Sequence, residues 1–169
     1  MKSHRSDFIA ENRGGPLTKH QHRLLMIWAR NCIMHVLPQV NFTLNELLNQ
    51  IMKISKDWET GEASVGEARN ASFKAINMAR ELSDPVSVEI VRGIGQMVAV
   101  AHMADHAIGS AEYALSALTC KGKNIDSERE WQNDQLPVDI KIQVLTARKQ
   151  KKKFWQGHRK KLLLKIKTN

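Results

Sequence analysis

The sequence has few of the residues that divide a chain into parts or cross-link it. Its 169 residues include four prolines and two cysteines, and no Gly/Ser-rich stretch separates one region from another. No run approaches the ~20 apolar residues of a membrane span, and no N-terminal stretch has the apolar core of a secretory signal peptide. We therefore expect one globular domain in the cytoplasm.

The two cysteines offer no motif. Cys32 and Cys120 lie far apart in the chain and form neither a CxxC nor a zinc-finger spacing. We expect two free, partly buried thiols.

Strand alternation is also missing, whereas helix-start signals are frequent. These signals predict helices that begin near Thr18, Thr43, Ser64, Asp84 and Ser127. Four of the five residues are followed three positions later by Glu or Gln, which is the capping-box pattern. The fifth precedes a proline that suits the first helical position. The expected fold class is all-α, a compact single-domain bundle of five to seven helices.

Apolar and small residues indicate how these helices pack. In the first helix, Trp28 and Cys32 share one face and Ile33 lies opposite, which predicts neighbours on two sides. Residues 85–118 stay helix-compatible for longer than usual, with three interrupting glycines. We expect a break near residues 93–102, followed by an alanine-rich helix at the centre of the bundle.

Acidic residues are missing from the C-terminal end. Residues 140–169 hold eleven of the 26 Lys/Arg and none of the 17 Asp/Glu, so the preceding 139 residues carry a net charge of −2. This pattern predicts a flexible N-terminal arm (residues 1–17), a helical domain (18–147) and a basic C-terminal extension (148–169). Like charges repel, so we expect the extension to be loosely attached and dispensable for stability.

One polar cluster could carry chemistry. On a continuous helix, His102 and His106 would stack at i,i+4 beside Asp105, as the histidines of a zinc-binding H-E-x-x-H helix do. His35 or Cys32 could supply a further ligand. The cluster fits a buried hydrogen-bonded patch, a metal site or a catalytic site. The glutamate base of H-E-x-x-H is absent, as are a nucleophile elbow and a phosphate-binding loop, so we assign no catalytic residue and no cofactor.

The basic extension has its own possible partners. Phe154 and Trp155 stand among its lysines and arginines. Such a segment could bind nucleic acid or an anionic membrane surface. The oligomeric state is left open by the sequence.

Three stretches together resemble a known family. They are WARNCIMHVL (28–37), VAHMADHAIGSAEYAL (100–115) and EREWQNDQLP (128–137). Their order and spacing resemble the immunity proteins called immunity type five of bacterial polymorphic toxin systems, over roughly residues 20–147. The middle stretch, with its His-x3-His-x2-Gly-x3-Tyr pattern, is the most specific.

The resemblance implies an α-helical protein that is made beside a toxin and protects its producer by binding that toxin. It implies no enzyme activity and no established cofactor, and it carries over no toxin-binding residue. The basic tail after Lys149 departs from the family pattern. The alternatives are a small metal-binding protein or enzyme centred on His102 and His106, and a nucleic-acid or membrane-surface accessory protein that acts through the basic tail.

Overall fold

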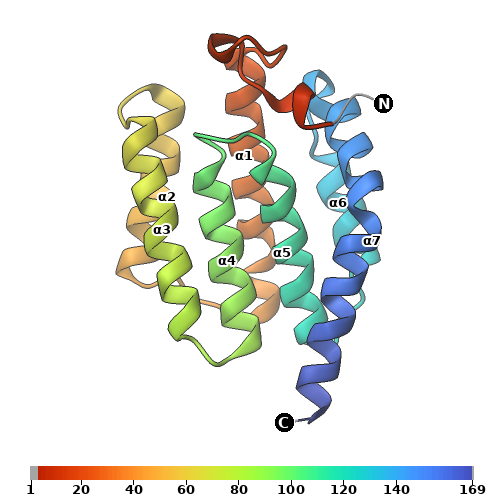
Figure 1. The fold of residues 1–169 in the computed structure, drawn as a ribbon. Coiled ribbons are helices and arrows are strands. Elements are labelled where there is room, and N and C mark those ends of the chain that lie inside the picture. Colours follow the sequence, from red (N-terminus) through yellow and green to blue (C-terminus); the bar gives the residue numbers. More distant parts are fainter. Residues whose placement is uncertain (1–3, 169) are drawn as a thin grey trace.

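A computed structural model describes residues 4–168 and shows seven α-helices that run alternately up and down (Figure 1). They are α1 (Lys19–Val36), α2 (Glu46–Thr60), α3 (Val65–Glu81), α4 (Pro85–Ala99), α5 (His106–Cys120), α6 (Asp126–Asp134) and α7 (Val138–Thr168). Three short 3-10 helices accompany them: η1 (His4–Phe8), η2 (Glu11–Arg13) and η3 (Pro38–Val40). Within residues 4–168 the only β-pairing is an isolated bridge between Ala10 and Leu17, so the all-α prediction is confirmed.

Three helix starts follow their local capping signals. Thr18 and Ser64 each form a complete capping box with the Gln or Glu three residues later. Asp84 accepts a hydrogen bond from the backbone N–H of Ser87, and Pro85 follows it as the first helical residue. These starts depend on neighbouring residues alone, which is why the sequence predicts them.

Two other starts shift because a competing acceptor lies close by. The box predicted at Thr43 does not form, since Asn45 caps α2 by accepting from the N–H of Leu48. Asparagine is at least as good an N-cap as threonine. The box predicted at Ser127 is also wrong. Asn124 accepts from the N–H of Asp126, and α6 begins at Asp126, two residues before the start that a cap at Ser127 would give.

α4 and α5 form the centre of the bundle. α4 contacts α1, α2, α3 and α5, whereas α5 contacts α1, α4, α6 and α7. The alanines of α5 are buried: Ala107, Ala111, Ala114 and Ala117. Small side chains let helices approach closely, and the predicted central alanine-rich helix is confirmed.

The break between α4 and α5 lies at residues 100–105, at the C-terminal limit of the predicted region. Gly93 and Gly95 do not break α4. A Cβ at Gly93 would lie 2.6 Å from Cδ1 of Ile33, and one at Gly95 would lie 3.2 Å from Cβ of Ala75. These glycines therefore allow α4 to pack closely against α1 and α3.

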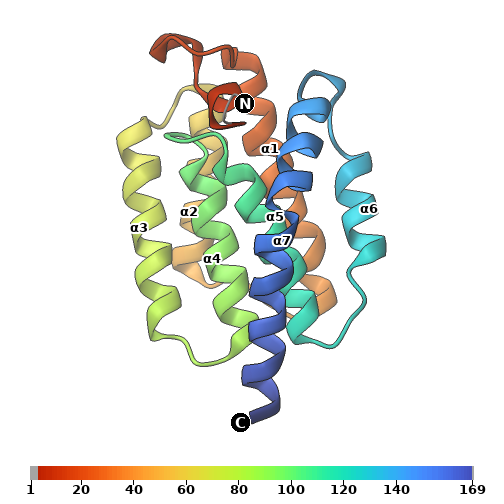
Figure 2. The same ribbon diagram turned by 45° about the vertical axis from the view of Figure 1, so that its right-hand side comes forward.

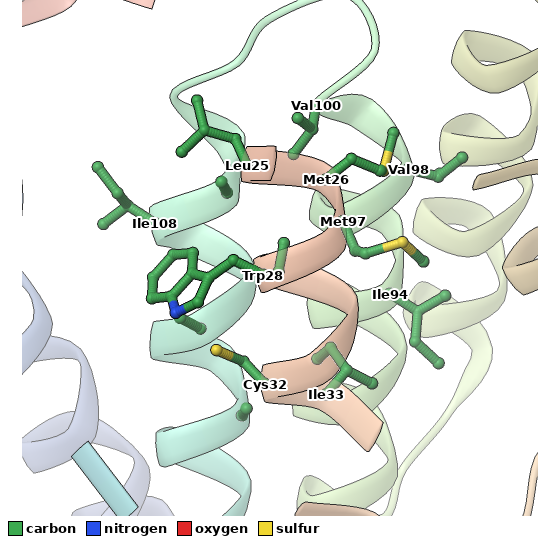
Figure 3. Close-up of a cluster of buried hydrophobic side chains, with 14 of the residues drawn as sticks. Leu25, Met26, Trp28, Cys32, Ile33, Ile94, Met97, Val98, Val100 and Ile108 are labelled. Carbon is green, nitrogen blue, oxygen red and sulfur yellow. The ribbon is translucent and has the colours of Figure 1, made fainter. Parts of the chain in front are cut away.

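α1 is buried on two sides, as its sequence predicts. Figure 3 shows Trp28 and Cys32 directed toward α5, while Ile33 points toward Ile94 and Met97 of α4. All five side chains are at most 1% exposed. The first helix thus joins the two central helices into one core.

The N-terminal arm lies over one end of the bundle, at the top of Figure 1. Phe8 and Leu17 are buried, and Glu11 accepts a hydrogen bond from the N–H of Lys19. Residues 1–3 of the predicted arm lie outside the described residues. From Phe8 onward, the arm packs against the domain.

α7 differs from the loosely attached extension expected after residue 147. It is one continuous helix that runs along α5 on the outside of the bundle (Figure 2). Arg148, Trp155 and Arg159 are buried on its inner side. Within residues 4–168, no helix combines the length and the apolar character that a membrane span requires.

Candidate functional site

The predicted pair of histidines does not lie on one helix. His102 belongs to the turn between α4 and α5, whereas His106 is the first residue of α5. The two rings lie 5.4 Å apart, and Nδ1 of His106 is 2.7 Å from Oε1 of Gln96. The predicted i,i+4 stacking is wrong because the helix is interrupted at this point.

His102 has an unusual environment. Its Nδ1 atom is buried and makes no hydrogen bond within the described residues. Burial, aided by the positive charge of Arg69, lowers the pKa of His102. His102, Asp105 and His106 are each half-buried, so the cluster is not the fully buried patch that was one of its three interpretations.

The further ligands proposed for a metal lie elsewhere. Nδ1 of His35 is 2.8 Å from the buried carboxylate of Glu128, and the His35 ring stacks on Trp131 at 3.6 Å. His35 stands near the end of α1, whereas residues at the start of α1 contact the 100–105 turn. Cys32 is buried between α1 and α5, and burial raises the pKa of its thiol. Among the described residues no group of three or more His, Cys, Asp or Glu is placed to hold a metal ion.

A hollow of about 580 Å³ opens beside His102, where the arm meets the ends of α1, α2 and α3. Leu17, Trp58 and Val65 form part of its apolar wall. Arg13, Lys19, Arg23 and Glu11 also line it, which gives three cations and one carboxylate. The hollow is therefore chemically suited to an acidic group that carries an apolar portion.

His22 closes the inner side of this hollow. Its Nε2 lies 2.5 Å from the carbonyl oxygen of Val100. Because a carbonyl can only accept, Nε2 carries the proton in this bond. Burial lowers the pKa of His22, and the bond to Val100 partly opposes that effect. The neutral ring joins α1 to the turn that bears His102.

A second polar cluster lies inside the bundle and attaches α7. Glu112 of α5 accepts hydrogen bonds from Arg148 at 3.1 Å and from Arg159 at 2.8 Å. Arg148 also donates to Gln132 and Asn133 of α6, each at 2.8 Å. We call Glu112, Gln132, Arg148 and Arg159 the α7 anchor; all four are buried.

Glu89 of α4, the central helix beside α5, also forms an ion pair with a residue of α7. It is fully buried, and its carboxylate lies 2.7 Å from Nε2 of His158 and 3.2 Å from Arg92. α7 is thus held by carboxylates on both central helices.

Comparison with protein families gives one assignment. A family model described as "Imm-5 like putative immunity protein" matches residues 15–139. The chain belongs to this immunity family. Comparisons with curated proteins and with solved structures give no match.

The match to the immunity family ends at the start of α7. It includes the 100–105 turn, both Glu112 and Gln132, and the part of the hollow's lining that lies after residue 14; Glu11 and Arg13 of the arm precede it. Arg148 and Arg159 lie beyond it. The α7 anchor therefore connects the segment matched to the immunity family to a helix that lies outside it except for its first two residues.

Sequence reasoning missed this anchor, although a signal was present. Glu89 and Glu112 are isolated acids in otherwise apolar or small-residue helices, and such positions favour a buried ion pair. Arg148, Trp155 and Arg159 are spaced by seven and four residues, which places them on one helix face. The ion pairs could not be predicted, because the acids and the basic residues that bind them are far apart in the sequence.

Proposed function

We propose that this protein is an immunity protein that binds and neutralises a cognate toxin and so protects the cell that makes both. The toxin belongs to a bacterial polymorphic toxin system, and the protein acts in the cytoplasm by binding, without catalysis. The family match over residues 15–139 carries this proposal. It contains all three stretches whose pattern resembles immunity type five.

The form of the molecule supports a binding role. The helices pack around one continuous core, and α7 is attached to that core by buried ion pairs. An inhibitor of this kind needs a surface that is already formed, because less conformational freedom is then lost on binding.

Co-expression tests the proposal. The toxin domain encoded by the neighbouring reading frame is expressed with and without this protein, and growth is measured. Growth should be restored by the protein, and the two purified chains should co-elute as a complex. Continued killing, together with the absence of a complex at about micromolar concentration, would contradict the proposal.

Metal analysis provides an independent check on the alternative centred on His102 and His106. Protein purified without chelator should contain less than one zinc per chain, because the candidate ligands lie apart. Stoichiometric metal that is lost in a His102→Ala/His106→Ala variant would instead favour the metal-binding alternative.

A further inference from the structure

One side of α7 is exposed along almost its whole length. At 100° per residue, nine exposed residues fall within an arc of about 100°. We call them the outer face: Val138, Ile142, Lys149, Lys152, Lys153, Gln156, Lys160, Leu163 and Lys167. At about 1.5 Å per residue, the outer face is roughly 44 Å long.

The exposed apolar side chains of the protein are concentrated on α7. Six of the ten large apolar side chains exposed in the described part of the chain lie on this helix. Val138 and Ile142 are 84% and 82% exposed, more than any other member of that set. A contiguous exposed apolar pair beside charged residues is typical of a protein-binding surface.

The arginines and the lysines of α7 lie in different environments. Between residues 148 and 168, both arginines are buried in the α7 anchor, whereas all eight lysines are exposed. Among the described acids, Asp105 approaches one of these lysines, at 3.9 Å from Lys151, which lies off the outer face. Among residues 4–168, no carboxylate forms an ion pair with a lysine of the outer face, which therefore presents positive charge.

The α7 anchor also fixes how the helix is rotated. Because Arg148 and Arg159 both bind Glu112, α7 cannot turn about its axis without breaking buried ion pairs. Buried ionic contacts of this kind can specify a single arrangement of helices. The outer face is thus held toward solvent in a defined orientation.

We propose that the outer face of α7 is the toxin-binding surface, an inference that rests on the proposed function. The surface that it binds on the toxin is acidic and has an apolar patch at one end. The lysines meet the carboxylates, while Val138 and Ile142 enter the apolar patch. Every outer-face residue except Val138 lies beyond the family-matched segment, which supports this placement, because specificity for one toxin requires a surface that differs between family members.

Nucleic acid is the less favoured partner. Arginine is the residue best suited to phosphate and base recognition, and both arginines of this segment are occupied by Glu112. Of the two adjacent aromatics, Trp155 is buried against Tyr113, which leaves Phe154 alone for stacking.

Matched charge reversals test the placement. The first variant is Lys149→Glu/Lys152→Glu/Lys160→Glu, on the outer face. The control is Lys56→Glu/Lys74→Glu/Lys121→Glu, three exposed lysines outside α7 with the same change in net charge. A third variant, Val138→Ser/Ile142→Ser, removes the apolar pair and leaves the charge unchanged. Binding to the purified toxin domain is measured by calorimetry, and circular dichroism checks folding.

The outer-face charge variant should bind about tenfold more weakly or worse, while the control stays within about twofold of wild type. The apolar variant should also lose about tenfold in affinity. Rising salt should slow association of wild type more than of the outer-face charge variant.

Several results would overturn the placement. Unchanged binding by both outer-face variants, or equal losses in outer-face and control charge variants, would place the interface elsewhere and leave the proposed function standing. Outer-face-dependent binding to random duplex DNA, with toxin binding unaffected, would assign α7 to nucleic acid. If folded wild type fails to bind or neutralise the toxin, the proposed function itself fails.

Discussion

Glu112 is a single carboxylate that forms ion pairs with two buried guanidinium groups. Replacing it with glutamine leaves Arg148 and Arg159 buried without an opposite charge. Breaking a buried ion pair on one side typically costs about 3–5 kcal/mol. We expect Glu112→Gln to lower the free energy of unfolding by about that amount in urea titration. The control Glu130→Gln, at an exposed position, should be nearly neutral, and equal effects would contradict the proposed importance of the α7 anchor.

Two glycines in helices should respond oppositely to alanine. A Cβ at Gly93 meets Cδ1 of buried Ile33 at 2.6 Å, whereas one at Gly157 has open space. Overpacking a core costs about 1–3 kcal/mol, against a helix-propensity gain of up to about 1 kcal/mol. We expect Gly93→Ala to destabilise the protein and Gly157→Ala to stabilise it by about 0.5–1 kcal/mol.

Ile33→Val provides the matched test of that contact, because valine lacks Cδ1. Added to Gly93→Ala, it should recover part of the lost stability in thermal melts. A double variant whose loss of stability equals or exceeds the sum of the single losses would show that the two side chains do not clash.

His22 should make stability depend on pH. Burial lowers its pKa in the folded protein, so the unfolded chain takes up the proton more readily. Stability should therefore fall as pH drops from about 6.5 toward the folded-state pKa. His22→Gln keeps a donor for the Val100 carbonyl but does not titrate. Its free energy of unfolding should vary less between pH 7.5 and 5 than that of wild type; an unchanged difference would exclude His22 as the source.

Among the helices, α7 differs most from what its composition predicts, because it is packed against the bundle and not loosely attached. Charge density alone predicts that deleting residues 150–169 changes little, but the deletion removes Trp155, His158 and Arg159 from their buried partners. Losing a buried tryptophan alone costs about 3–5 kcal/mol. We expect the melting temperature to fall by roughly 10 °C, at about 2–4 °C per kcal/mol for a chain of this size.

A shorter deletion is the control for this experiment. Removing residues 165–169 retains the α7 anchor and should change the melting temperature by less than about 3 °C. Equal melting temperatures for wild type and the longer deletion would support the loosely attached tail instead.

The other helices show which parts of the fold sequence alone can predict. α1, α3 and α4 begin at their predicted caps because each cap is completed within three residues. α2 and α6 shift because two acceptors compete over a short distance. The anchoring of α7 could not be predicted in this way, since Glu112 and Arg159 are 47 residues apart.

For the whole molecule, the sequence predicts the helical class and the family, whereas the spatial site depends on packing. The hollow beside His102 forms where the arm meets the ends of three helices, so no local motif announces it. His35 and His102 lie in different places because α1 and the 100–105 turn meet only at the start of α1. That His35 and His102 are both histidines therefore did not predict that they lie close together.

A mutation has different consequences on the two sides of α7. A mutation at Arg148, Trp155 or Arg159 removes a buried contact and lowers stability, whatever the protein binds. A mutation at Lys152 or Lys160 leaves the folded body intact and alters only what the helix presents. Descendants of this gene can therefore diversify along one side of a single helix while the other side stays constant. A recombination crossover near codon 139 would instead exchange nearly the whole helix, so the incoming segment would have to bring its own partners for Glu89 and Glu112.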